Sequence, residues 1–288
     1  MFNKATELLN LCKEQNKKIS EIVMEKEMKH SKISYEELID RMNDILNTMV
    51  SSANSALDKE VISVSKISGG NAKKMETYKN KGNTISGNLI NSAMARALST
   101  SEVNAAMGRI VAAPTAGASG ILPSALLTTR ERFNLSNEDM IHGLFTAAGI
   151  GEIIAKNATI SGAEGGCQAE CGAASAMAAA AIVELVGGSV ETSLHAASFA
   201  IINILGLVCD PIAGLVEFPC ALRNASGVAN ALISADLAMA GIESMIPFDE
   251  VVEAMYKVGK AMPESLRETA LGGVAATPTG EEFKKKNL

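Results

Sequence analysis

The chain has 288 residues, of which 47% are hydrophobic, so it can bury a substantial core. Its formal net charge of -6 argues against a nucleic-acid surface, because binding to phosphates needs a clustered basic face. Its five cysteines are an odd number, which in a reducing compartment favours metal ligation or catalysis over a disulfide framework.

The N-terminal segment is rich in charged side chains, and its apolar residues recur at helical spacing. This pattern predicts two long amphipathic helices. Ser34, with Glu37 three residues later, forms a capping box that marks the start of the second helix. Cys12, a lone thiol in the first helix, is expected to pack rather than to react. We therefore expect an N-terminal helical arm over residues 1–60, ahead of a helical catalytic domain over residues 61–288.

A glycine turn, Ser-Gly-Gly-Asn at residues 68–71, precedes Lys73 and Lys74. Backbone N–H groups in such a turn, next to positive charge, suit an anion, so Asn71 is a candidate substrate-binding residue. An ordinary surface loop fits the same residues. No Gly-Lys-Ser/Thr sequence follows, which excludes a phosphate-binding P-loop. Lys73 is also a candidate general base.

From residue 85 onward, alanine-rich segments alternate with glycine and proline stops, which predicts a series of closely packed helices. Ser99 or Thr100 is expected to cap a short helix. Ser136 with Asp139 is expected to cap a longer one.

The loop at residues 114–120 reads Pro-Thr-Ala-Gly-Ala-Ser-Gly and precedes a helix. Two glycines and two hydroxyls at a helix N-terminus suit a small carboxylate, because the first N–H groups of a helix lack intrahelical partners. Thr115, Gly117 and Ser119 are therefore candidate substrate-binding residues. An ordinary turn between helices fits the loop equally well.

The sequence from residue 169 to residue 185 is dense in alanine and predicts a central helix buried on most faces. Ser189 is expected to cap the next helix, which should reach Cys209. Strand-like alternation is found only, and weakly, at residues 61–67. The predicted fold class is all-α, with a large alanine-rich helical domain.

The N-terminus leads straight into charged residues, without an apolar signal segment, so we expect a cytoplasmic protein. Residues 192–208 are nearly uncharged, but His195 and Asn203 interrupt them and Asp210 closes them. This run is too short to span a membrane.

Four of the five cysteines lie between Cys167 and Cys220, in an apolar part of the chain. Glycine or proline stands beside Cys167 and Cys220, and Asp-Pro follows Cys209, which suggests that turns bring separate segments to one site. Only Cys167 and Cys171 are a close pair, so the spacing fits a zinc knuckle poorly. Dispersed thiolates suit a cuboidal iron–sulfur cluster, in which three protein ligands leave one iron open as a Lewis acid.

Specific motifs surround these cysteines: Glu-Gly-Gly-Cys-Gln-Ala-Glu at residues 164–170, Cys-Asp-Pro at 209–211 and Phe-Pro-Cys at 218–220. Together with the loop at 114–120 they resemble the α subunit of the iron–sulfur-dependent L-serine dehydratases. The resemblance extends over roughly residues 68–280 and implies an all-helical catalytic domain.

The resemblance implies that Cys167, Cys209 and Cys220 hold an oxygen-labile [4Fe-4S] cluster. Cys171 lies about one helical turn from Cys167 and is either a helix-packing residue or a neighbour of the cluster. Some single-chain relatives finish with a cysteine that can occupy the open iron. Residues 286–288 contain none, so no capping by the tail is expected.

The same resemblance implies deamination of L-serine to pyruvate and ammonia, with the open iron stabilising charge on the departing hydroxyl. His142 and His195 lie in apolar helical surroundings that are more typical of packing residues than of bases. The family points instead to a histidine in a β portion that this sequence lacks. We therefore expect a hetero-oligomer with a β subunit that closes the site and contributes the base.

Three other functions remain open. A related iron–sulfur lyase could act on another β-substituted amino acid, such as a desulfidase on L-cysteine. A pyridoxal-phosphate dehydratase could use Lys66, Lys73 or Lys74 as its Schiff-base lysine, but the expected mixed α/β pattern is absent. A non-catalytic helical protein could use the thiols for a structural metal or for redox sensing.

Overall fold

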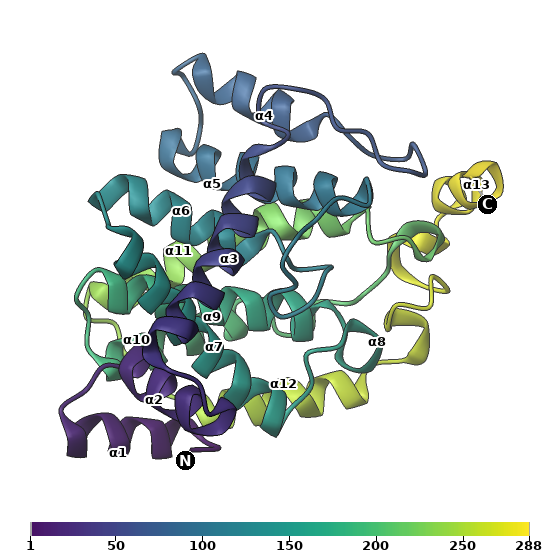
Figure 1. The fold of residues 1–288 in the computed structure, drawn as a ribbon. Helices are drawn as coiled ribbons and strands as arrows, with labels where there is room; N and C mark the ends of the chain where they lie inside the picture. Colours follow the sequence, from purple (N-terminus) through teal and green to yellow (C-terminus); the bar gives the residue numbers. More distant parts are fainter. Residues whose placement is uncertain (1, 288) are drawn as a thin grey trace.

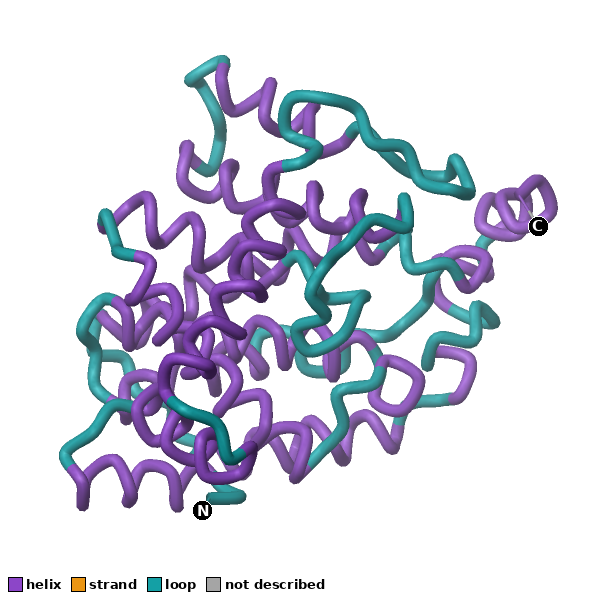
Figure 2. The backbone as a smooth tube through the Cα atoms, in the orientation of Figure 1, coloured by secondary structure: helices purple, strands orange, loops and turns teal. Residues whose placement is uncertain are grey.

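The computed structural model describes residues 2–287, in which there are thirteen α-helices and no β-strand (Figure 2). The all-α prediction is confirmed. Residues 61–67, the one stretch with weak strand alternation, contribute only an isolated bridge between Ile62 and Gly69. None of the described helices combines the length and apolar character needed to cross a bilayer. The expectation about the tail concerns residues 286–288, of which Leu288 lies outside the described residues.

The helices, in chain order, are α1 (Ala5–Gln15), α2 (Ile19–Ser31), α3 (Tyr35–Asn54), α4 (Asn71–Asn80), α5 (Gly87–Ala105), α6 (Ile121–Phe133), α7 (Asn137–Asn157), α8 (Gly162–Gly165), α9 (Ala173–Leu185), α10 (Val190–Ile202), α11 (Cys220–Met239), α12 (Phe248–Ala261) and α13 (Pro278–Asn287). A π-helical segment, Gln168–Gly172, leads directly into α9. The two ends of the chain lie on different sides of the molecule (Figure 1).

Helix α9 lies at the centre of the molecule, as the alanine-rich sequence predicts (Figure 1). It packs against α6, α7, α10 and α11, and all of its residues from Ala173 to Glu184 are buried. Methyl side chains allow this, because they let neighbouring helices approach closely from several directions. The centre of the fold is therefore a small-residue contact between helices.

The first 60 residues form three helices, where the sequence predicted two. Asn16 adopts the left-handed conformation (φ 52°) and ends α1, as asparagine often does after a helix. The apolar spacing that continues past residue 16 therefore belongs to two helices. Helix α3 begins after Ser34 as predicted, and the Ser34 hydroxyl accepts a hydrogen bond from the Glu37 amide at 3.2 Å.

The N-terminal helices are packed onto the rest of the chain. Helix α2 contacts α7, and α3 contacts α5, α6 and α7. The buried carboxylate of Glu184 in α9 accepts hydrogen bonds from the Ile19 amide (2.9 Å) and the Thr146 hydroxyl (2.7 Å). A carboxylate at the start of α2 is favourable because the helix dipole is positive there. The division of the chain at residue 60 stays a prediction.

Ser99 and Thr100 do not cap a helix, because α5 runs through both of them without a break. The Ser99 hydroxyl donates to the Ser52 carbonyl (2.8 Å) and accepts from the Ala56 amide (3.0 Å). The serine is therefore used to join α5 to the end of α3.

The helix predicted to reach Cys209 ends earlier, at Ile202. The chain then turns at Gly206, whose φ of 90° suits glycine alone among common residues. The Gly206 amide donates to the side chain of Gln168 at 2.9 Å. A tertiary hydrogen bond thus fixes this turn, and the turn lets the segment that carries Cys209 approach Cys167.

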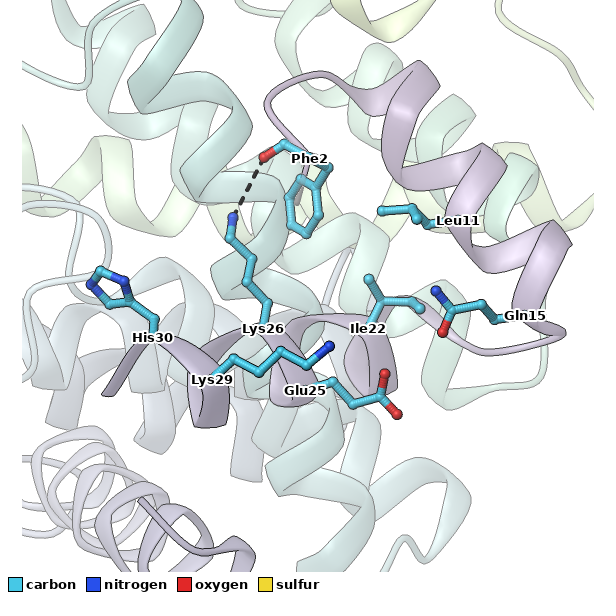
Figure 3. Close-up of a pocket in the computed structure, with 8 residues that line it drawn as sticks. All are labelled: Phe2, Leu11, Gln15, Ile22, Glu25, Lys26, Lys29 and His30. Atoms are coloured by element: carbon cyan, nitrogen blue, oxygen red, sulfur yellow. Dashed lines mark hydrogen bonds between the residues drawn. The ribbon is translucent and has the colours of Figure 1, made fainter. Parts of the chain in front are cut away.

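A cavity of about 310 Å³ lies beside the N-terminal helices α1 and α2 (Figure 3). Phe2, Leu11 and Ile22 supply its apolar wall. The Lys26 ammonium lies 3.9 Å from the centre of the Phe2 ring and 2.5 Å from a carboxylate oxygen of Glu152. None of the cysteines lines this cavity, so the thiol chemistry lies elsewhere.

Gly149→Val should lower the free energy of unfolding by about 1–3 kcal/mol. A Cβ at residue 149 would lie 2.5 Å from Cγ2 of Val23, where α2 crosses α7. Valine is β-branched and has one strongly preferred χ1 rotamer in a helix, so it cannot easily rotate away from this contact. Urea unfolding followed by circular dichroism measures the change. Ala148→Val adds the same side chain at an exposed position of α7 and should change stability by less than about 0.5 kcal/mol. Equal losses would contradict the packing.

Ser136→Ala should cost about 1 kcal/mol of stability. The Ser136 hydroxyl caps α7 by accepting from the Asp139 amide (3.1 Å), and the Asp139 carboxylate accepts from the Ser136 amide (2.8 Å). The Ser136 hydroxyl and amide hold the pKa of Asp139 below its usual value. A lowered carboxyl pKa stabilises the fold above about pH 4 and loses this effect as the pH falls further. The difference in urea midpoint between Ser136→Ala and the unaltered protein should therefore shrink below about pH 4. Ser51→Ala, at an exposed position of α3, should neither lower the midpoint nor show this pH dependence.

Candidate functional site

Four free, buried thiols come from three segments of the chain: Cys167 and Cys171 from one, Cys209 from the next and Cys220 from the start of α11. The sulfur atoms of Cys167 and Cys171 are 3.4 Å apart. The sulfur atoms of Cys167 and Cys209 and a carboxylate oxygen of Glu170 all lie within 4.8 Å of one another. Cys220 begins α11 and has an exposed fraction of 8%. The sulfur and carboxylate atoms of Cys167, Cys209 and Glu170 could hold a metal ion, and Cys220 lies outside this group of three.

The segment around Cys167 is held by the side chain of Gln168, which has an exposed fraction of 0%. Its amide donates to the carbonyls of Gly165 (2.9 Å) and Met255 (3.0 Å), and its oxygen accepts from the Gly206 amide. These bonds fix the π-helical segment between Cys167 and α9. Single-turn π segments are frequent at functional sites.

The segment around Cys209 is paired with the C-terminal part of the chain. The Cys209 amide donates to the Leu266 carbonyl (2.9 Å), and the Cys209 carbonyl accepts from the Glu268 amide (2.7 Å). The neighbouring carboxylate of Asp210 accepts from the Val274 amide (2.7 Å) and pairs with the Arg223 guanidinium (2.5 Å). Residues 266–274 therefore form one wall of the thiol site.

Asn224 joins the loop at residues 114–120 to the start of α11. Its side-chain amide donates to the carbonyls of Gly117 (2.6 Å) and Cys220 (2.9 Å), and its oxygen accepts from the Gly120 amide (2.8 Å). Asn224 has an exposed fraction of 1%. The candidate carboxylate loop is thus fastened directly to a candidate metal ligand.

Within that loop, the Ser119 hydroxyl donates to the Ala116 carbonyl at 2.7 Å. The side chain of Thr115 has no well-formed hydrogen bond, although it lies near enough to Glu170 to lower the pKa of that carboxyl. Among the described residues, the amides of residues 115–117 donate no hydrogen bond. The loop therefore has unused donors.

The turn at residues 65–71 is bonded to Glu217, three residues before Cys220. The hydroxyls of Ser65 and Ser68 donate to the two carboxylate oxygens of Glu217 at 2.6 and 2.7 Å. The Asn71 amide donates to the buried carboxylate of Glu102 at 2.5 Å. The backbone amides at the start of α4 are thus already bonded to Glu102. Only the side chain of Asn71 is left to bind a ligand. Lys73 follows in α4 and is half-buried.

The two histidines considered as bases are engaged elsewhere. His142 Nδ1 lies 3.0 Å from the Ser20 hydroxyl, between α7 and α2. His195 Nδ1 accepts from the Ser244 amide at 3.1 Å, between α10 and the approach to α12. These contacts are those of packing residues.

The pKa values of the four thiols are shifted in different directions. Hydrogen bonds from Cys171 and Cys209, together with the Arg223 guanidinium, hold the pKa of Cys167 well below its usual value. The bond to Cys167, burial and the nearby negative charge raise the pKa of Cys171 and of Cys209. Burial raises the pKa of Cys220 to about 12. The raised pKa values of Cys209 and Cys220 favour their protonated forms, so metal binding through these thiols has to release protons.

Glu170 is the clearest residue that the sequence predictions missed. Burial, and then the charge of Cys167, raise the pKa of its carboxyl to about 7. Its place in the motif was a usable signal, because a residue three positions after Cys167 lies on nearly the same helix face. Asn224, four positions after Cys220, could have been found in the same way.

Comparison with known proteins adds independent evidence. The family described as serine dehydratase alpha chain matches residues 14–275. The chain is 53% identical to the L-serine dehydratase alpha chain of Peptoniphilus asaccharolyticus, over 100% of this chain and 99% of that one. It is 49% identical to the probable L-serine dehydratase alpha chain of Bacillus subtilis, over 99% and 95%.

A longer relative covers the same region. The chain is 37% identical to L-serine dehydratase 1 of Escherichia coli, over 95% of this chain but 61% of that protein. The match over residues 14–275 and the likeness along the whole length of two alpha chains lead to one conclusion. This chain belongs to the serine dehydratase alpha chain family.

Proposed function

We propose that this chain is the α subunit of an L-serine dehydratase, which converts L-serine to pyruvate and ammonia. The observation that carries the proposal is the group of buried thiols beside a donor-rich loop, which Asn224 joins to the backbone carbonyl of Cys220. A metal site next to donors for a small carboxylate suits the elimination of water from an amino acid.

We propose that Cys167, Cys209 and Cys220 hold a [4Fe-4S] cluster. The donor chemistry fits, because cysteine thiolates are the usual ligands of such clusters and these three are buried on separate segments. When bound, the cluster supplies an open iron that acts as a Lewis acid toward the leaving hydroxyl. Cys171, whose sulfur is 3.4 Å from that of Cys167, is assigned as a neighbour that packs the first turn.

The loop at residues 114–120 would bind the substrate carboxylate. The unused amides of residues 115–117 and the Thr115 hydroxyl are donors of the kind that carboxylates accept. Ser119 would act by holding the loop in shape through its bond to Ala116. Asn71 would contribute its side-chain amide from the turn that Glu217 fastens near Cys220.

The general base is assigned to a second chain. Lys73 is the candidate base on this chain, and it carries weaker support than a residue of a β subunit. Two relatives are themselves called alpha chains, and the longer Escherichia coli relative has 39% of its length outside the match (100% minus 61%). A β subunit would close the site and exclude water. Free, buried thiols suit a reducing cytoplasm.

Cys167→Ala, Cys209→Ala and Cys220→Ala should each lose most of the bound iron and sulfide after anaerobic reconstitution, because each removes one cluster ligand. Metal and sulfide analysis with electron paramagnetic resonance measures the loss. Cys12→Ala removes a buried thiol of α1 and should retain the full complement, and Cys171→Ala should retain it as well. An intact cluster in Cys209→Ala would refute the ligand assignment, and loss in Cys171→Ala would make that residue a ligand.

The iron-loaded α chain alone should release pyruvate from L-serine at least about 100-fold more slowly than the chain purified with its β subunit. The reason is that a positioned general base contributes roughly 10²–10⁴ in rate. Coupled assays of pyruvate and ammonia measure the difference. Full activity of the isolated α chain would contradict the two-chain proposal. Faster release of sulfide from L-cysteine than of pyruvate from L-serine would instead favour the desulfidase function.

A further inference from the structure

The carboxylate of Glu170 faces the space between the thiols and the loop at residues 114–120. One of its oxygens lies within 4.8 Å of the sulfur atoms of Cys167 and Cys209. Its side chain remains partly exposed, so a small molecule can reach it. The carboxylate therefore lies where a substrate held by the loop and the metal site would have to bind.

Two glycines from separate segments leave room for this carboxylate. A Cβ on Gly162 would lie 2.7 Å from Oε2 of Glu170, and a Cβ on Gly117 would lie 3.3 Å from Oε1. A side chain at residue 162 would force the carboxylate to move. The carboxylate thus lies next to Gly162 and next to the loop that we propose binds the substrate carboxylate.

Glu170 has no cationic partner among the described residues. No lysine or arginine forms an ion pair with it. Arg223, whose charge lowers the pKa of Glu170, is paired with Asp210 at 2.5 Å and bonded to the Val208 carbonyl at 2.7 Å. A partly buried carboxylate without a counter-ion is unfavourable in its charged form, and a cationic ligand would stabilise that form.

We propose that Glu170 binds the α-ammonium group of the substrate. The assignment rests on the proposed function, in which the substrate is a zwitterionic amino acid. The ammonium and carboxylate groups of such a molecule are attached to the same carbon atom, and Glu170 and Gly117 are correspondingly adjacent. One side chain would then select α-amino acids over the corresponding hydroxy acids, because an acid without the ammonium would leave the Glu170 charge unpaired.

Glu170→Gln tests this assignment, because it removes the charge and keeps the shape. In the iron-loaded enzyme at pH 8, the KM for L-serine should rise roughly 10- to 100-fold, as expected for the loss of a charged hydrogen bond. The inhibition constant of 3-hydroxypropanoate, which is L-serine without its ammonium group, should change by less than about threefold. Glu170→Asp keeps the charge and should recover part of the affinity for L-serine.

The matched control is Glu164→Gln, which removes an exposed carboxylate from α8 in the same motif and should leave both constants unchanged. Iron content and the electron paramagnetic resonance spectrum should be the same in Glu170→Gln as in the unaltered protein. If either changes, Glu170 is a metal ligand and the assignment is wrong. Equal weakening of both compounds, or an unchanged KM for L-serine, would also overturn it.

Equilibrium dialysis with labelled L-serine keeps the test valid if the variant is inactive. If the unaltered enzyme releases no pyruvate from L-serine, the proposed function fails. Dialysis against L-serine and 3-hydroxypropanoate still shows, in that case, whether Glu170 distinguishes a molecule with an ammonium group from one without it.

Discussion

The hydrogen bonds of the Asn224 side chain are the interaction on which the rest of the site depends. One buried amide engages the loop at residues 114–120 at two places and the carbonyl of Cys220 at a third. Gly120 permits this, since a Cβ there would lie 2.5 Å from the Ala97 carbonyl oxygen and 3.0 Å from the Asn224 side chain. The donors proposed for the substrate and a proposed metal ligand are therefore parts of one hydrogen-bonded unit.

Much of the fold could be predicted because its signals are local. Alanine density placed α9 at the centre, and the caps at Ser34 and Ser136 act within one turn of helix. The prediction failed where a residue serves a distant partner. Ser99 resembles a cap in sequence, yet its hydroxyl joins α5 to α3. The end of α10 depends on the bond between Gly206 and Gln168, which no local pattern contains.

The residues of the candidate site also fall into two groups, those that a sequence pattern identifies and those that only the folded structure identifies. The cysteines could be selected from their number and spacing, because few other residues suit a soft metal. Glu170 and Asn224 are ordinary polar residues in sequence, and their importance depends on the burial and partners that folding gives them. Asn71 shows the converse, because its turn looks open in sequence while Glu102 already occupies its backbone amide.

The pairing of Cys209 with residues 266–268 has a consequence for the order of assembly. Both backbone groups of Cys209 are bonded to this C-terminal segment, and its side chain has an exposed fraction of 2%. The position of the Cys209 thiol therefore depends on a segment much later in the chain. The group of thiols is complete only after the C-terminal region has docked.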